Sequence, residues 1–362
     1  MRTYKSNLKN KLRNGIAISL IPQIIVVQWL ANRPDIIERY YSTGIYENIS
    51  LFFRTLFGWI PFSVGEIIYT LLIVLALRYF FRNWKKIKQH PLSFVRNSVM
   101  VLAVFYFTFH VLWGLNYYRQ PLHQTLGIQE EASYDEIKDL TNALIIKTNA
   151  LQMQLTADST KIVNFPFTRT EVFEKTVANY DQVAKEFPFL KYDCTNLKKS
   201  MYSSMSSYLG IGGYLNPFTN EAQVNSKTPL FRFPVVAAHE IGHQVGYSAE
   251  NETNLIGYMV TQKNEDVYFQ YAASAYALAY CLNAINRTDE VAFNLMVEKL
   301  NKGVKDNYQE LQDFHEAYEN PLEPIFTSIF SAFLKANNQA DGVQSYSRVV
   351  HLLVGYHKKY PL

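Results

Sequence analysis

Cysteine is nearly absent from this sequence, which has only Cys194 and Cys281 among its 362 residues. Zinc ribbons and related sites need pairs of cysteines a few positions apart, and that spacing is missing here. Two cysteines are also too few for a scaffold built on several disulfides. Any metal must therefore be held by histidine or carboxylate groups. The two thiols either form one disulfide in an oxidising compartment or both stay free, and the sequence leaves both outcomes open.

Acidic residues are scarce in the first 115 residues. That part has 14 Lys and Arg against 4 Asp and Glu, which leaves 21 against 27 for the rest of the chain. A basic, apolar segment before an acidic body is typical of membrane association. The acidic body has no basic stripe with which to bind phosphates, so we expect no nucleic-acid partner.

The same part holds three long apolar runs, at residues 15–31, 64–81 and 98–115. Each has 17 or 18 residues, near the lower limit for crossing a bilayer, and the flanks can add a turn. The first run is too long for the apolar part of a signal peptide and lacks a cleavage site of small residues. We therefore expect residues 1–115 to form a membrane anchor of three transmembrane helices, with the lipid bilayer as a partner.

Loop charge predicts how the anchor is oriented. The segment before Gly15 and the loop between the second and third runs carry Lys and Arg without acidic residues, whereas the first loop is mixed. Positively charged loops stay in the cytoplasm. Three crossings then place residues 116–362 outside the cytoplasm, in the periplasm of a Gram-negative cell. We expect a multi-pass protein of the inner (cell) membrane with a cytoplasmic N-terminus.

Two ionisable residues, Glu66 and His110, lie within these runs, near the outer face in this topology. Ionisable groups inside a membrane are costly and often functional. The simpler expectation is that the two side chains pair with each other or reach water at the headgroups.

Residues 116–362 have no repeats, no low-complexity tract and no long linker, and their apolar periodicity is mostly helical. Ser133 and Glu136 form a capping box that starts a helix. The clearest β pattern is the alternation over residues 221–225, which follows a glycine-rich stretch. Apart from one helix that starts near Val235, helices are expected at residues 135–155, 170–187, 196–207, 251–263, 267–285, 290–300, 305–318, 325–335 and 346–356. The run at 267–285 is apolar enough to consider as a fourth span, but its polar residues favour a buried core helix.

The segment His239-Glu240-Ile241-Gly242-His243 matches the pattern H-E-x-x-H on a predicted helix. Histidines at i and i+4 lie on one helical face, so both imidazoles can bind one zinc ion. Zinc lowers the pKa of its bound water to about 7, and Glu240 can take the proton and pass it to a leaving amine. We expect one Zn²⁺ per chain and Glu240 as the catalytic general base. The strand-like segment before the helix is of the kind that holds an extended peptide.

A catalytic zinc site needs three protein ligands and one open position. Ala249 stands where the metzincin pattern requires a third histidine, so that class is excluded. Gly246 allows the chain to turn, after which Glu250 or Glu252 can supply the third ligand. The two lie about 200° apart on a helix, so only one can face the metal, and the spacing does not separate them. Asn254, one turn after Glu250, can orient a zinc-bound histidine.

A tetrahedral intermediate also requires an oxyanion donor, and a substrate requires further contacts. Residue type and position offer several candidates, for each of which a plain structural role competes. These candidates are Tyr214, Asn216, Asn254, Tyr258, His315, Tyr346 and Arg348.

Three functions are consistent with these residues. The first is a zinc metallopeptidase that cleaves peptides or proteins, including membrane-tethered ones, at the outer membrane surface. The second is a zinc-dependent amidase or hydrolase of cell-envelope material, and the third is a non-catalytic membrane protein with a structural or degenerate zinc site. An intramembrane protease is disfavoured, because only about ten apolar residues precede the motif and a span needs about 20.

The sequence resembles an uncharacterised bacterial family of membrane-anchored proteins, a domain of unknown function with an H-E-x-x-H site. The resemblance covers nearly the whole chain. It rests on W-G-L-N-Y-Y-R at 113–119, G-Y-L-N-P-F-T at 213–219, H-E-I-G-H-Q at 239–244, E-N-E-T-N at 250–254 and F-L-K-A-N-N at 333–338. It implies a zinc peptidase of the gluzincin kind without an assigned substrate. Together with the patterns above, this predicts a mainly α protein: three transmembrane helices, then a mostly helical zincin-like (gluzincin) domain with a small β element before the active-site helix.

The resemblance also bears on the third ligand. E-N-E-T-N is similar to the E-x-x-A-N and E-x-x-A-D stretches of other gluzincins, in which the first glutamate binds zinc. This similarity favours Glu250. Thr253 stands where those stretches have alanine, which is a small departure.

Overall fold

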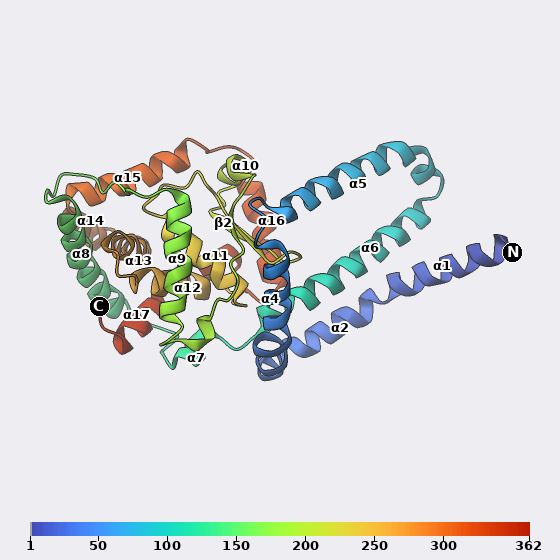
Figure 1. Cartoon of the computed structure of the whole chain (residues 1–362), viewed down its shortest axis with the longest axis horizontal. Helices are drawn as coiled ribbons and strands as arrows, with labels where there is room; N and C mark the ends of the chain where they lie inside the picture. Colours follow the sequence, from blue (N-terminus) through green and yellow to red (C-terminus); the bar gives the residue numbers. More distant parts are fainter. Residues whose placement is uncertain (1) are drawn as a thin grey trace.

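The computed structural model describes the backbone of residues 2–362 and the side chains of residues 8–344 and 348–362. The protein is mainly α, with 72% of the chain in helices and a small three-stranded sheet before helix α11. Figure 1 shows four helices, α1, α2, α5 and α6, projecting to one side of a helical body. The predicted fold class is confirmed at this level.

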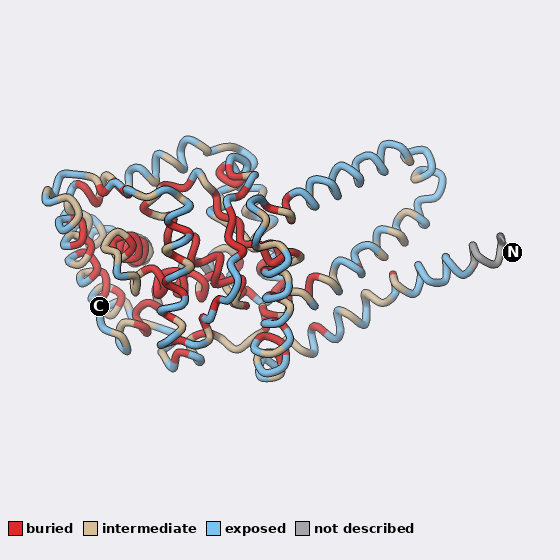
Figure 2. Tube along the Cα trace, in the orientation of Figure 1, coloured by how far each residue is buried: buried red, intermediate tan, exposed pale blue. Residues whose placement is uncertain are grey.

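Three helical stretches near the N-terminus are long and apolar enough to cross a membrane, as predicted. The first is Leu8–Ala31, which comprises part of α1 (Arg2–Ile18) and all of α2 (Leu20–Ala31); the others are α5 (Val64–Gln89) and α6 (Pro91–Leu112). Their apolar side chains are largely exposed, whereas buried residues concentrate in the body (Figure 2). Exposed apolar surface of this extent is unfavourable in water, which favours a lipid environment.

The third stretch ends three residues earlier than predicted. Trp113 leaves the helical conformation with φ −159°, and Gly114–Tyr118 form the short 3₁₀-helix η2. The chain thus turns into the body directly at the end of α6.

The loop between the first two apolar stretches is helical, which the sequence analysis missed. It forms α3 (Pro34–Ile36), the π-helix η1 (Ile37–Ile45) and α4 (Tyr46–Phe57). Tyr41 and Tyr46 from this segment join a small apolar core with Phe109, Trp113 and Tyr118. The segment therefore lies against the body and does not hang free between two spans.

The body is built from helices that mostly begin and end within a few residues of the predicted positions. The capping box of Ser133 and Glu136 is confirmed, and a second one, Thr168 with Glu171, was missed. The helices are α7 (Leu122–Leu126), α8 (Tyr134–Thr156), α9 (Arg169–Val183), η3 (Pro188–Leu190), α10 (Ser203–Tyr208), α11 (Phe233–Gln244), α12 (Glu250–Gln262), α13 (Val267–Thr288), α14 (Glu290–Glu298), α15 (Lys302–Glu316), α16 (Glu323–Ala336), η4 (Gly342–Arg348) and α17 (Val349–Lys359).

The sheet consists of β1 (Leu197–Lys199), β2 (Gly213–Asn216) and β3 (Glu221–Val224) in the order β1-β3-β2. β1 pairs with β3 in parallel, and β2 pairs with β3 antiparallel. The predicted helix over residues 196–207 is wrong in its first half, because residues 197–199 pair with β3 and only Ser203–Tyr208 are helical. A three-residue strand is too short to show its alternation in the sequence.

Helix α13 lies inside the body, as expected for a core helix. Most of its residues between Phe269 and Ile285 are buried, and its run of alanines lets α8 and α12 pack closely against it. Cys281 is buried on this helix and Cys194 is exposed, so both cysteines are free thiols.

The expectation that Glu66 and His110 pair with each other or with water is wrong for Glu66. The Glu66 carboxylate is fully buried and accepts hydrogen bonds from Ser200 Oγ (2.5 Å), Met201 N (2.8 Å) and Tyr214 Oη (2.7 Å). The body, which the sequence does not place beside α5, supplies these partners. His110 instead donates from Nδ1 to the carbonyl of Tyr106 at 2.9 Å.

Candidate metal centre

Two consecutive helices, α11 and α12, carry the candidate metal-binding residues. Glycines at the crossing let these helices approach closely. A Cβ built on Gly242 would lie 3.3 Å from side-chain atoms of Thr253 and Ile256, and one on Gly257 would lie 2.9 Å from the carbonyl oxygen of Val235. Gly246, between the helices, has φ +95°, which only glycine adopts readily.

The crossing brings His239, His243 and Glu250 together in a buried group whose donor atoms all lie within 4.8 Å of one another. Glu250 Oε2 is 3.3 Å from His239 Nε2 and 3.6 Å from His243 Nε2. Ligands of a tetrahedral zinc ion at about 2.0–2.2 Å lie roughly 3.3 Å apart. The separations therefore fit a single ion between the three side chains.

The outward-facing ring nitrogens are already engaged. His243 Nδ1 donates to the carbonyl of Tyr247 at 2.7 Å. The His239 ring forms a hydrogen bond with Asn254, whose Oδ1 also accepts from Tyr276 at 2.6 Å. Such partners fix the ring orientation of metal-binding histidines. Both Nε2 atoms are thus held toward Glu250, and Asn254 has the orienting position that its spacing predicted.

Glu240 lies beside the group and is buried, and its Oε2 atom has no hydrogen-bond partner among the described residues. The carboxylate faces β2, since a Cβ built on Gly213 would lie 2.5 Å from Glu240 Oε1. Burial raises the pKa of Glu240 to about 8, although the charge of His243 opposes this shift. A carboxyl group with a raised pKa and an unpaired oxygen is suited to exchange a proton.

The electrostatics of the group favour a positive charge at its centre. Burial alone would raise the pKa of Glu250, but the neighbouring imidazoles hold it well below its usual range. Burial opposes the charge of His243, yet the Glu250 and Glu240 carboxylates raise its pKa to about 9. The pKa of His239 is lowered, mainly by burial. The ionised Glu250 carboxylate therefore attracts a cation to the point between the two Nε2 atoms, where a metal ion would bind.

Glu252, the alternative third ligand, points elsewhere. Its Oε1 accepts a 2.6 Å hydrogen bond from the backbone nitrogen of Leu122, at the start of α7. Burial raises the pKa of Glu252 to about 7, while this hydrogen bond and the charge of Arg119 oppose the shift. Glu250, and not Glu252, is thus the carboxylate that the fold brings to the two histidines.

Residues 41–354 match the family described as a protein of unknown function (DUF3810). The chain belongs to this family. The match includes α5, α6 and every residue of the metal group, and it begins after α1 and α2. No curated protein and no solved structure matches the chain significantly. In this DUF3810 member the buried group has the form of an H-E-x-x-H…E motif.

The last carbonyls of α11, and the carbonyl of Gly246 just after it, are bound by residues from the first 119 positions, a feature that the sequence analysis missed. Trp113 Nε1 donates to the carbonyl of His243 (3.2 Å), and Arg119 donates to that of Gly246 (2.9 Å). Tyr46 and Ser50 both donate to the carbonyl of Gln244, at 2.9 and 3.0 Å. A helix leaves its final carbonyls without internal partners, so these contacts hold the end of the motif helix in place.

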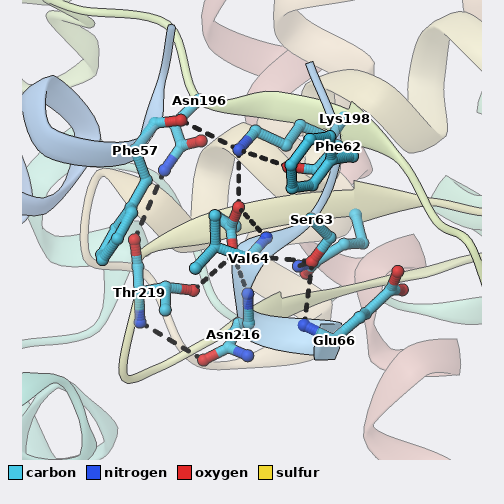
Figure 3. A network of polar contacts seen from close by, with 12 residues as sticks. Phe57, Phe62, Ser63, Val64, Glu66, Asn196, Lys198, Asn216 and Thr219 are labelled. Carbon is cyan, nitrogen blue, oxygen red and sulfur yellow. Dashed lines mark hydrogen bonds and ion pairs between the residues drawn. The ribbon is translucent and has the colours of Figure 1, made fainter. Parts of the chain in front are cut away.

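A buried ionic network joins the start of α5 to the sheet (Figure 3). Glu221 on β3 accepts hydrogen bonds from the first amides of α5, Val64 (2.9 Å) and Gly65 (2.6 Å). Lys198 on β1 forms a 2.6 Å ion pair with Glu221 and donates to the carbonyls of Phe57, at the end of α4, and Phe62, just before α5. Buried charges of this kind depend on each other, because either one alone would be unpaired. The second apolar span is therefore fixed to the sheet that flanks the metal group.

The remaining candidates from the sequence analysis lie in other settings. Tyr214 is on β2, but its hydroxyl is bound to Glu66. Asn216 Oδ1 accepts from the backbone of Phe218 and Thr219 in the turn after β2, which is the turn interpretation of that segment.

Three further candidates lie on the later helices. Tyr258 Oη lies 2.6 Å from His357 Nε2. His315 is exposed on α15 with its ring against Phe314, and Arg348 is exposed and pairs with Asp341. The side chain of Tyr346 is outside the described residues.

Proposed function

We propose that this protein is a membrane-anchored zinc metallopeptidase, with His239, His243 and Glu250 as zinc ligands and Glu240 as the general base. The observation that carries the proposal is the convergence of three buried donor atoms on one point, beside a carboxylate with an unpaired oxygen. Three ligands and one open position are the arrangement of catalytic zinc sites, whereas structural zinc sites use four protein ligands.

The donor set fits zinc in particular. Two imidazole nitrogens and one carboxylate oxygen are the ligands of the His₂Glu class of catalytic zinc sites. Zinc bound there would polarise a substrate carbonyl and make water acidic enough to attack it at neutral pH. Glu240 accepts the proton of the attacking water and then delivers it to the leaving nitrogen. Glu240 Oε2, which has no hydrogen-bond partner among the described residues, is available for both transfers.

The sheet favours a peptide as the substrate. β2 is at the edge of the sheet, and Gly213 places its backbone directly against Glu240. An extended peptide can pair with such an edge through its main chain, which would bring a scissile bond beside the metal group. The absence of a side chain at position 213 lets the Glu240 carboxylate lie directly against this strand.

The proposal includes a topology, with residues 1–115 as the anchor and residues 116–362 as an extracytoplasmic catalytic domain. Arg96 Nη1 donates to Asn10 Oδ1 at 3.5 Å, and Figure 1 shows the N-terminus and the turn between α5 and α6 at the same end of the molecule. Both basic segments can therefore lie on one, cytoplasmic, side. Reporter fusions test the arrangement: a C-terminal alkaline phosphatase should be active, and a fusion after His90 should not.

Peptide hydrolysis by the purified full-length protein tests the function. Wild-type protein loaded with zinc should cleave members of a peptide library. Glu240→Gln should reduce the rate at least about 100-fold, the usual contribution of a general base. Glu174→Gln, which changes an exposed carboxylate on α9, serves as the matched control. Equal activity in wild type and Glu240→Gln would contradict the proposal, and cleavage restricted to amide bonds of cell-wall fragments would redirect it to an envelope amidase.

A further inference from the structure

Helix α16 presents an uncharged, apolar face to the outside of the body. Eleven consecutive residues, Pro324–Leu334, carry no charge. Leu322, Ile325, Ile329 and Phe333 are 65%, 58%, 64% and 39% exposed. Their spacing of three, four and four residues puts them on one side of the helix. A soluble protein seldom exposes such a stripe without a partner for it.

Another surface helix of the same body shows the contrast. Helix α15 is also largely exposed, but its outer positions are filled by Lys, Asp, Glu and Gln. The side of α15 that faces water is thus charged, as expected. The composition of α16 therefore points to a different environment on its exposed side.

A second apolar stripe adjoins α16. Met201, Met205 and Tyr208, in and just before α10, are each about half exposed and are spaced by four and three residues. Asn320, just before α16, donates a 2.6 Å hydrogen bond to the carbonyl of Tyr208, so the two helices meet there. Together these residues form what we call the apolar collar: Met201, Met205, Tyr208, Leu322, Ile325, Ile329 and Phe333.

The collar touches a membrane span at each end. At one end, the backbone nitrogen of Met201 donates to Glu66 in the first turn of α5. At the other end, the ring of Phe333 lies 6.1 Å from that of Phe109, in the last turn of α6. The exposed apolar surface of the spans thus continues onto the body through α10 and α16, at the level where the spans end.

We propose that the apolar collar is inserted in the interfacial region of the bilayer that holds the spans, with α16 lying along the membrane surface. A helix of 14 residues is about 21 Å long, too short to cross a hydrocarbon core of about 30 Å, so it lies in the plane. Helices of this kind bury their apolar face at the boundary between headgroups and acyl chains. Tyr208 suits the headgroup level at the edge of the collar.

The contacts with the spans favour lipid over a protein partner. Because Phe333 packs on Phe109 at the end of α6, the lipid around that span already reaches the start of the collar. A second copy or another protein would have to displace this lipid to cover α16. The bilayer covers the collar without any further component.

The same helix borders the metal centre. The ring of Phe333 lies 6.2 Å from that of Tyr117, and Gln339, just after α16, contacts the backbone nitrogen of Glu250. At the other end, a Cβ built on Gly210 would lie 3.2 Å from Glu323 Oε1, shortly before β2 begins. In the proposed arrangement, helix α16 thus lies between the metal group and the membrane surface. With the proposed peptidase function, on which this consequence rests, the substrates are polypeptides held at the bilayer surface.

Depth-dependent quenching in lipid vesicles tests the collar without reference to activity. The exposed Cys194 is replaced by serine, and single cysteines at Ile325, Ile329 or Met205 are labelled with a polarity-sensitive fluorophore. Leu102→Cys, on α6, is the control for a span, and Val291→Cys, on the exposed side of α14, is the control for water. The vesicles contain lipids with quenchers at shallow or deep acyl positions.

The collar labels should lose emission with shallow quenchers, the span label should lose most with deep quenchers, and the label at 291 should lose none. Labels at 325, 329 and 205 that behave like the label at 291 would overturn the proposal. Energy transfer between differently labelled copies, without lipid quenching, would instead assign the collar to self-association. The readout is fluorescence and does not depend on catalysis. If the collar labels are quenched but the protein cleaves no peptide, the proposed function is contradicted and the membrane contact of the collar is not.

Discussion

The indole nitrogen of Trp113, in the residue that follows α6, donates a 3.2 Å hydrogen bond to the carbonyl oxygen of His243, a residue of the metal group. Their rings also meet edge to face, with centroids 6.1 Å apart. The end of the third apolar span thus supports the motif helix directly. Helix α6 and the candidate metal group are parts of one packed unit at this point.

Replacing the donor of that bond should weaken the centre. Trp113→Phe keeps an aromatic ring but removes one hydrogen bond, which costs about 1 kcal/mol. We expect thermal unfolding a few degrees lower and zinc affinity reduced about tenfold, the lower end of the effect of residues that support metal ligands. Trp59→Phe is the matched control, because Trp59 is exposed and donates only to nearby Leu56. Equal effects of the two substitutions would show that the Trp113 contact does not support the centre.

A methyl group at position 213 should impair catalysis without removing the metal. The Cβ of Gly213→Ala would lie 2.5 Å from Glu240 Oε1 and 2.8 Å from the carbonyl oxygen of Gln223, so the carboxylate must move. We expect peptide hydrolysis to fall at least about tenfold, since displacing a catalytic group by about 1 Å can cost 100-fold. Zinc content should stay unchanged.

The adjacent Gly212→Ala is the control for that experiment. Its Cβ would meet only the side chain of Val236, at 3.6 Å, an ordinary contact. Wild-type activity in Gly212→Ala together with low activity in Gly213→Ala is the expected pair of results. Full activity in both variants would show that Glu240 does not need its present position.

The ion pair of Lys198 and Glu221 should be essential for stability. Lys198→Met leaves a fully buried carboxylate without its cation, and breaking a buried pair in this way costs about 3–5 kcal/mol. We expect a large drop in melting temperature or failure to accumulate. Lys302→Met breaks the exposed pair with Asp306 and should cost less than about 0.5 kcal/mol. A small effect of Lys198→Met would mean that the Glu221 contacts with α5 suffice without the lysine.

The lowered pKa of His357 predicts how the free energy of unfolding depends on pH. Burial lowers the pKa of His357 to about 4, although the Nδ1 contact with the Tyr360 carbonyl opposes this shift. Nε2 accepts from the Tyr258 hydroxyl, so the folded protein holds the ring neutral. The unfolded chain takes up a proton near pH 6.5, before the folded protein does. This contribution is therefore complete above pH 6.5 and is lost as the pH falls toward 4, by at most about 3 kcal/mol.

Melting temperatures between pH 7.5 and 4.5 check that sign. Stability should fall over this range in the wild type and in His90→Gln, which changes an exposed histidine. His357→Gln should start lower but show a smaller fall. An unchanged slope in His357→Gln would assign the acid sensitivity to other groups.

The two histidines of the candidate metal group and much of the helical fold follow from local sequence signals. Histidines four residues apart, a capping box at Ser133 and long apolar runs each depend on neighbours within a few positions, so periodicity and spacing reveal them. The choice between Glu250 and Glu252 does not follow from spacing. It is set by how closely α12 crosses α11 at Gly242 and Gly257, which is a tertiary relationship.

The features that the sequence did not reveal are long-range contacts. Glu66 looks like an isolated acid in an apolar run, and only the fold brings Ser200 and Tyr214 to it. Tyr46 and Ser50 reach Gln244 from almost 200 positions away and carry no local signature. The segment at 113–119 carries part of the family resemblance, but its contacts with the end of α11 depend on how the helices pack.

The metal content of the purified full-length protein tests the central claim most directly. Wild type and Glu252→Gln, in which the amide oxygen can still accept from Leu122, should each bind about one zinc per chain. Glu250→Gln should bind far less, because it removes the charged ligand from the group of His239 and His243. The account would be contradicted if Glu252→Gln lost its zinc while Glu250→Gln kept it. It would also be contradicted if the wild type, purified without chelators, contained no zinc.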